Sequence, residues 1–131
     1  MQNIIYAEFL NEWTWQWFAT LTFLDVGFNK EKTHERRLRW TRSLSKKEKL
    51  RVGYYYALVF KDRHPHLHLL MIGRNKYGKT LNDVDSYYWQ KQWDYIARIE
   101  KPMSNVSVSN YFSANLAEFT GELGIYNVKL L

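Results

Sequence analysis

The feature that most constrains the fold is a pair of strand-like segments separated by a short polar turn. Tyr54–Phe60 is rich in aromatic and branched apolar residues, and Lys61–Pro65 is polar and ends in proline. His66–Ile72 then alternates histidine with leucine before Gly73 closes the segment. Two such segments on either side of a short turn predict an antiparallel β-hairpin.

The second of these segments has two chemically different faces, because side chains alternate along a strand. His66 and His68 share one face, while Leu67 and Leu69 share the other, which we expect to face the core. Two neutral imidazoles on one face can bind one divalent cation. The alternative is a half-buried strand that carries histidines on its polar face. Three of the four histidines fall within five residues, which favours the metal site, although His64 precedes the strand.

Further segments extend this hairpin into a mixed fold. Lys30–Lys49 lacks glycine and proline and carries Trp40 and Leu44 four residues apart, which predicts a helix. Helices interspersed with antiparallel strands indicate an α+β fold, a central antiparallel sheet with helices packed on it, in one domain over residues 1–131. The other expected elements are strands at Trp17–Phe23, from Asn105 and at Ile125–Lys129, and helices at Asp83–Arg98, capped by Asn82 or Asp83, and at Asn110–Glu122.

Positive charge is concentrated in the expected long helix. From Lys30 to Arg51 there are ten Lys and Arg against three Asp and Glu, whereas the rest of the chain has nine against ten. Such a local excess indicates a surface for nucleic acid, although a solvated helix could carry it as well. Aromatic residues form 18% of the chain and fit either a packed core or stacking on unpaired bases. The candidate DNA-binding residues are Arg36, Arg37, Arg39, Arg42, Lys46 and Lys47.

The composition also excludes several classes of protein. There is no cysteine, so disulfides, thiolate metal sites and a cysteine nucleophile are ruled out. The N-terminal segment contains acidic residues and lacks the basic start of a signal peptide. No apolar run is long enough to cross a membrane. We therefore expect a soluble cytoplasmic protein with no membrane partner.

Three segments, in order, resemble the motifs of the HUH endonuclease superfamily, whose members replicate, mobilise or transpose DNA. Pro65–Leu70 reads PHLHLL, like the His-hydrophobic-His motif, and Phe18–Phe23 reads FATLTF, like the first motif of rolling-circle replication initiators. Val108–Leu116 resembles the helix that bears the nucleophile, with Tyr111 in that position and Ala114 where the family usually has lysine. With one tyrosine in this helix and no helicase domain, the chain is similar to the small nuclease-only initiators of archaeal viruses and plasmids.

The resemblance implies a ferredoxin- or RRM-like HUH nuclease fold and a defined chemistry. His66 and His68 would bind Mn²⁺ or Mg²⁺. Tyr111 would attack single-stranded origin DNA, with or without a hairpin, and stay attached to the 5′-phosphate while rolling-circle replication of a plasmid or virus begins. The candidates for a third metal ligand are Asp62, Asn115 and Glu118.

Several other interpretations of the function are also compatible with the sequence. A transposase or relaxase of the same superfamily would use the same residues. A non-catalytic module that binds single-stranded nucleic acid would need the aromatic residues and the basic helix, but no metal site. A metal enzyme of another class would need a third clear ligand. The sequence leaves undecided the DNA target, the host element and whether the chain forms a homodimer.

Overall fold

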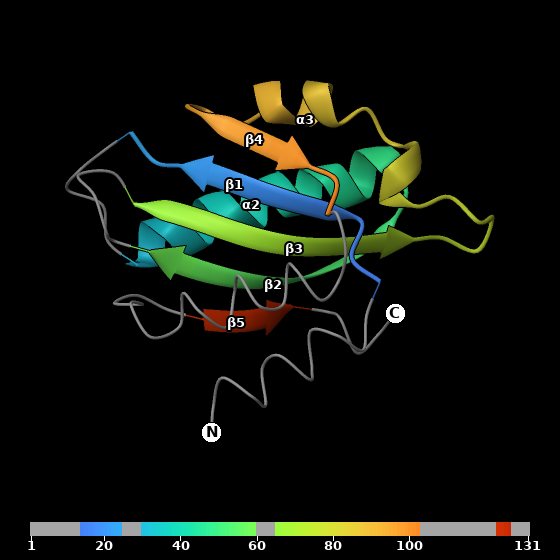
Figure 1. Cartoon of the computed structure of the whole chain (residues 1–131), viewed down its shortest axis with the longest axis horizontal. Coiled ribbons are helices and arrows are strands. Elements are labelled where there is room, and N and C mark those ends of the chain that lie inside the picture. The colour runs from blue at the N-terminus through green and yellow to red at the C-terminus, as the bar shows by residue number, and fades with distance from the viewer. Residues whose placement is uncertain (1–13, 25–29, 60–64, 103–122, 127–131) are drawn as a thin grey trace.

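The computed structural model of the chain describes residues 14–24, 30–59, 65–102 and 123–126. Over these residues the chain forms a strand-rich body with two α-helices and one 3₁₀ turn (Figure 1). The strands are β1 (Trp17–Thr22), β2 (Arg51–Val59), β3 (His66–Arg74), β4 (Ala97–Glu100) and β5 (Leu123–Tyr126). The helical segments are α2 (Lys30–Glu48), η1 (Leu81–Asp83) and α3 (Ser86–Lys91).

The strands form one sheet in the order β4-β1-β3-β2-β5, and every neighbouring pair is antiparallel. β3 is therefore the central strand, with β1 on one side and β2 on the other. β2 and β3 form the predicted hairpin, in which Val59 lies opposite His66 and Arg51 lies opposite Arg74. This arrangement confirms the expected α+β fold with a central antiparallel sheet and helices packed on it.

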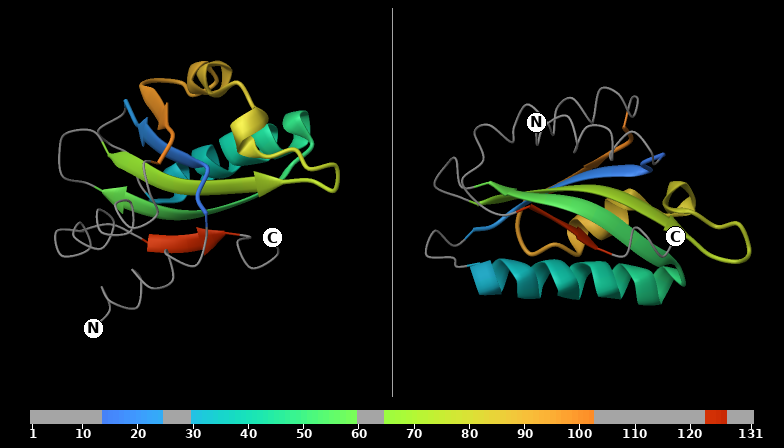
Figure 2. Two further views of the ribbon diagram at one scale, coloured as in Figure 1. Left: turned by 45° about the vertical axis from the view of Figure 1, so that its right-hand side comes forward. Right: turned by 90° about the horizontal axis from the view of Figure 1, so that it is seen from below.

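One face of the sheet is covered by α2 (Figure 2). Leu67 and Leu69 of β3 are on this face, are 1% and 0% exposed, and join a single buried cluster with Trp40 and Leu44 of α2. Burying one leucine side chain stabilises a fold by about 1.5–3 kcal/mol, so the packing of β3 against the apolar side of α2 stabilises both elements. α3 adds Trp89 to the same cluster, and the Trp40 indole Nε1 donates to the Trp89 carbonyl oxygen at 3.0 Å.

The prediction of a single helix at Asp83–Arg98 is wrong. Thr80 caps η1 and Asp85 caps α3, so two separate helical segments begin here, and α3 ends after six residues. The chain then becomes β4, which pairs with β1. Two tryptophans of this segment, Trp89 and Trp93, nevertheless reach the core. The pairing of β4 with β1 joins distant parts of the chain, and no local pattern shows it.

The remaining expectations concern the C-terminal part of the chain and the membrane. β5 begins at Leu123 rather than at Ile125. The strand expected from Asn105 and the helix expected at Asn110–Glu122 lie outside the described residues. Within the described part of the chain, no helix combines the length and the apolar character that crossing a membrane requires.

Candidate functional site

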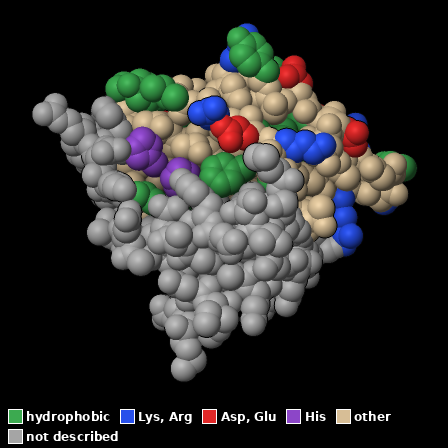
Figure 3. All heavy atoms as spheres, viewed as in Figure 1, with side chains coloured by type: hydrophobic (Ala, Val, Ile, Leu, Met, Phe, Trp, Pro, Cys, Tyr) green, Lys and Arg blue, Asp and Glu red, His purple; other side chains and the backbone are tan. Residues whose placement is uncertain are grey.

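His66 and His68 lie on the face of the sheet that α2 does not cover. Both belong to the first half of the central strand β3 and are half-buried, whereas Leu67 between them is buried on the other face. Histidine side chains reach the molecular surface in the view of this face (Figure 3). The two imidazoles therefore share one partly solvent-exposed face at the centre of the sheet.

Each of these imidazoles is held by a threonine of the neighbouring strand β1. Thr20 lies opposite His68 and Thr22 lies opposite His66 in the register of the sheet. In both pairs the threonine Oγ1 is 3.2 Å from the imidazole Nδ1. The threonine hydroxyl can donate to Nδ1 or accept from it, according to the tautomer of the ring. In the tautomer that donates from Nδ1 to the threonine oxygen, Nε2 carries the lone pair. That tautomer is the one that binds a metal through Nε2.

Thr20 and Thr22 were not among the predicted site residues. A signal for them is present in the sequence, because they alternate along β1 with the same period as the two histidines along β3. Their positions opposite the histidines depend on how β1 and β3 are aligned, and that alignment is set by the folded sheet.

The electrostatic state of His68 also suits a ligand. Burial, with a smaller contribution from the neighbouring His66, lowers the pKa of His68 from 6.5 to about 4. Phe18 forms part of these surroundings, since its ring centroid lies 5.9 Å from that of His68. The His68 imidazole is therefore neutral at physiological pH, as a metal ligand has to be.

A third ligand is not found in the part of the chain that the structure describes. Among these residues, no group of three His, Asp or Glu side chains could hold a metal ion. His66 and His68 are therefore a pair of candidate ligands, and other groups would have to fill the rest of a coordination shell. The predicted third ligands Asp62, Asn115 and Glu118, and the predicted nucleophile Tyr111, lie outside the described residues.

An ion pair on β4 occupies the same face as the histidines. Arg98 lies opposite Thr20, which in turn lies opposite His68, so the three residues form one row across β4, β1 and β3. Arg98 Nε is 2.5 Å from Glu100 Oε1, and these two side chains are 77% and 51% exposed. Because neighbouring strands lie about 4.8 Å apart, the Cα atoms of Arg98 and His68 are roughly 10 Å apart. Arg98, which the sequence pattern placed at the end of a helix, is thus a cation close to the candidate site.

The predicted DNA-binding residues of α2 do not all reach solvent. Arg37 is only 7% exposed, its guanidinium carbon lies 3.9 Å from the Tyr56 ring centroid, and its Nε donates to the Tyr54 hydroxyl at 3.2 Å. The prediction that Arg37 belongs to a DNA-binding surface is therefore corrected: its side chain packs inside the fold. Arg36 is partly exposed and forms an ion pair with Asp94 at 2.9 Å. The exposed members of the predicted set are Arg39, Arg42, Lys46 and Lys47.

α2, which carries the exposed cations, lies on one side of the sheet (Figure 2). The two histidines are on the other side, because Leu67 and Leu69, which alternate with them, are buried against α2. A nucleic-acid strand bound at one side would have to pass around an edge of the sheet to reach the other. The structure thus separates two candidate surfaces that are near each other in the sequence.

The described part of the site combines two imidazoles, each held by a threonine, with an arginine on the same face. Imidazole nitrogens can bind a divalent cation, and a guanidinium can bind a phosphate through its N–H groups. A phosphoester could therefore contact the guanidinium directly and the imidazoles through a cation that they bind. No protein family, curated protein or solved structure matches this chain.

Proposed function

We propose that this chain nicks and rejoins single-stranded DNA at a specific site, as HUH endonucleases that initiate rolling-circle replication do. The observation that carries the proposal is the register of β1 against β3, which pairs Thr20 with His68 and Thr22 with His66. The two described segments that resemble HUH motifs thereby meet through their polar side chains on one face. The antiparallel sheet with helices packed on it supports the finer proposal of a ferredoxin- or RRM-like nuclease fold.

The residues at this site fit a divalent cation. A metal-ligating histidine commonly donates its second ring N–H to an oxygen acceptor, and both histidines have a threonine oxygen at Nδ1. Two imidazoles, with oxygen donors in the remaining positions, suit Mn²⁺ or Mg²⁺. A cation bound here would neutralise charge on the scissile phosphate. His66 and His68 would hold it, and Thr20 and Thr22 would orient their rings.

Tyr111 is the proposed nucleophile, by its position in the segment that resembles the third HUH motif. A phenol reacts as the phenolate, so its proton has to pass to a base before the attack. The phenolate oxygen would bond to the scissile phosphorus as the bond from phosphorus to the 3′-oxygen breaks. The products are a 5′-phosphotyrosine and a 3′-oxygen that takes up one proton. One phosphoester bond replaces another, so attack by a 3′-hydroxyl can rejoin the strand.

Arg98 supports this proposal from the described part of the face. The scissile phosphate and its neighbours are anionic, and Arg98 lies in the same row as His68. Charge-assisted hydrogen bonds from a guanidinium to phosphate oxygens would position the DNA strand across β4, β1 and β3. Arg98 is accordingly proposed as a substrate-binding residue.

The experiment that tests the proposal incubates the protein with Mn²⁺ and labelled single-stranded oligonucleotides, with and without hairpins, and separates the products on a denaturing gel. We expect a shortened DNA with a free 3′-hydroxyl and a slow protein–DNA adduct. Tyr111→Phe should abolish the adduct and leave DNA binding intact, while Tyr87→Phe, at an exposed tyrosine on α3, should behave as the wild type. Cleavage without any adduct would refute a tyrosine nucleophile.

The metal assignment has a test of its own. His66→Ala should abolish Mn²⁺-dependent cleavage. Binding of the oligonucleotide in the presence of EDTA should stay unchanged. His34→Ala is the control, because His34 belongs to α2 and packs edge-to-face on Tyr56 instead. Unchanged cleavage by His66→Ala would exclude His66 as a ligand.

A second candidate function is non-catalytic binding of single-stranded nucleic acid. It is favoured by the lack, among the described residues, of a complete group of three metal ligands. In that case the protein would bind oligonucleotides equally well with Mn²⁺ or EDTA and cleave none of them. A transposase or relaxase of the same superfamily would form the same adduct, but on a transposon end or a transfer origin, so both belong in the oligonucleotide panel.

A further inference from the structure

The far end of β3 from the histidines carries a second charged feature. Arg74 is the last residue of β3 and lies directly opposite Arg51, the first residue of β2. Both side chains are exposed. Like charges directly opposite each other on neighbouring strands destabilise a sheet. A paired arginine position of this kind is favourable when an anion binds between the two guanidinium groups.

The surface around these arginines is hollowed. The hollow has a volume of about 570 Å³ and is lined by Arg51, Arg74, Asn75 and Lys76. Among the described residues that line it, three are cationic, the fourth has an amide that can donate hydrogen bonds, and none is acidic. Its chemistry therefore suits phosphate oxygens.

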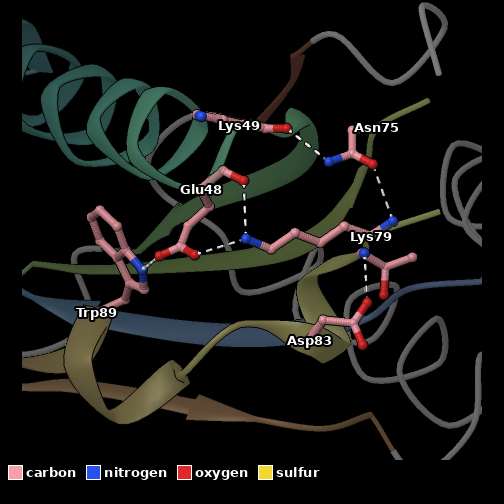
Figure 4. A network of polar contacts seen from close by, with 7 residues as sticks. Glu48, Lys49, Asn75, Lys79, Asp83 and Trp89 are labelled. Atoms are coloured by element: carbon pink, nitrogen blue, oxygen red, sulfur yellow. Dashed lines mark hydrogen bonds and ion pairs between the residues drawn. The ribbon is translucent and has the colours of Figure 1, made fainter. Parts of the chain in front are cut away.

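A polar network holds the loop that forms one wall of this hollow (Figure 4). The Asn75 side-chain oxygen accepts from the backbone N–H groups of Tyr77 and Lys79, at 2.9 and 3.1 Å, and its Nδ2 donates to the Lys49 carbonyl oxygen at 3.1 Å. Lys79 Nζ donates to the Glu48 carbonyl oxygen and to Oε1, at 3.1 and 3.2 Å. The loop is thereby tied to the end of α2, which pre-organises Lys76 and its neighbours for a ligand.

The same loop presents an aromatic ring to solvent. Tyr77 is 82% exposed, and Lys76 Nζ lies 5.2 Å from its ring centroid. An exposed aromatic ring next to cations is the combination that binds single-stranded nucleic acid, because the ring stacks on a base while the cations contact phosphates. A site for free phosphate would have no use for the ring.

We infer that Arg51, Arg74, Lys76 and Tyr77 form a second nucleic-acid contact, remote from the histidines. The cations bind phosphates of a single strand, and the Tyr77 ring stacks on one of its bases. Arg74 is six positions after His68 on β3, which corresponds to roughly 20 Å along the strand. This contact is a binding function of its own and holds whether or not the histidine site cleaves DNA.

The test measures binding of a fluorescent single-stranded oligonucleotide of about 20 nucleotides by anisotropy, over a series of salt concentrations and in EDTA. Arg51→Gln combined with Arg74→Gln should weaken binding equally for all sequences. It should also reduce the slope of log K against log salt by about 1.4, since each single-strand phosphate contact contributes about 0.7. Lys91→Gln combined with Lys101→Gln is the charge-matched control, at exposed lysines of α3 and of the segment that follows β4, and should leave the slope unchanged.

The stacking contact is tested by a matched pair of tyrosines. Tyr87 is also exposed and also has a lysine over its ring, Lys91 at 4.3 Å, so it reproduces the local chemistry of Tyr77 outside the hollow. Tyr77→Ala should weaken binding about tenfold, and Tyr87→Ala should have no effect. All variants should melt at or above the wild-type temperature, which excludes unfolding as the cause.

Two results would overturn the inference. One is that the arginine double variant keeps the wild-type salt slope, or loses no more of it than the lysine double variant. The other combines two measurements. Tyr77→Ala would bind the oligonucleotide like the wild type, and the arginine double variant would lose binding to phosphatidylserine vesicles that the wild type binds. That outcome would assign the hollow to anionic lipid headgroups instead.

Discussion

The two faces of the sheet are built from alternate residues of the same strands, yet they serve different ends. On the α2 face, Leu67 and Leu69 are 1% and 0% exposed and belong to one apolar cluster. On the other face, His66 and His68 are half-buried and are tied to threonines of β1. The histidine face is not wholly open, because Leu70 and its cross-strand neighbour Tyr55, which share this face, are 0% exposed. The apolar cluster against α2 therefore stabilises the sheet from one side, while the half-buried histidines of the other side keep partial access to solvent.

Truncating one residue on each face tests how much each face contributes to stability. Leu69→Ala should lower the free energy of unfolding by about 2–5 kcal/mol, because it removes buried apolar contacts and leaves a cavity. Ile72→Ala, at a half-buried position with the parity of the histidine face, should lower it by less. Urea unfolding of both variants measures the two values. Equal losses would show that the second face contributes to stability as much as the first.

Lowering the pH should reduce the free energy of unfolding because of His68. The unfolded chain protonates His68 near pH 6.5, but the folded chain does so only near pH 4. Between these values the unfolded state binds more protons, so the free energy of unfolding falls as the pH falls, by at most roughly 3 kcal/mol. Thermal melts from pH 7 to pH 4 measure this loss. His68→Gln should flatten the dependence in that window, and an unchanged profile in this variant would assign the loss to other groups.

Removing the threonine contacts should change metal affinity more than stability. Thr20→Val and Thr22→Val keep the size of the side chain but remove the oxygen at Nδ1, and each should weaken Mn²⁺ binding about 10- to 100-fold. Calorimetric titration with Mn²⁺ measures the affinity. Thr20→Ser retains the hydroxyl and should bind Mn²⁺ like the wild type. If the valine variants bind Mn²⁺ normally, the threonines have only a structural role.

The smallest expected effect concerns the Arg51 and Arg74 pair. Arg74→Thr should raise the free energy of unfolding by about 0.2–1 kcal/mol, because it removes a like-charge contact between neighbouring strands. High salt should shrink this gain by screening the repulsion in the wild type. Lys76→Thr removes the same charge outside the strand pair and should give a smaller gain. A destabilised Arg74→Thr would show that Arg74 makes favourable contacts within the fold.

Local patterns predicted those elements that are defined by neighbouring residues. The β2–β3 hairpin and α2 were expected because strand alternation and helical spacing are properties of short segments. The expected helix at Asp83–Arg98 failed because Trp89 and Trp93 can be buried by a short helix and the turn that follows it as well as by one long helix. The capping side chain of Asp85 was the available sign of a later start.

The sequence also contains a sign that Arg37 is buried. Arg37 precedes Trp40 by three residues and Leu44 by seven, so it lies on the inward side of the helix. Its positive charge assigned it to the exposed group. The rings of Tyr54 and Tyr56, which contact its guanidinium, belong to strand β2, so the sequence of the helix alone does not predict this contact.

Local sequence patterns are enough to predict the α+β class and the hairpin. They also predict the shared face of His66 and His68, because the direction of side chains along a strand is a local property of the backbone. Only the tertiary structure decided that Thr22 meets His66, a contact across 44 residues, and that α2 lies behind the histidines. Strand order and register depend on how the whole sheet packs its apolar face, and this packing is a property of the assembled fold.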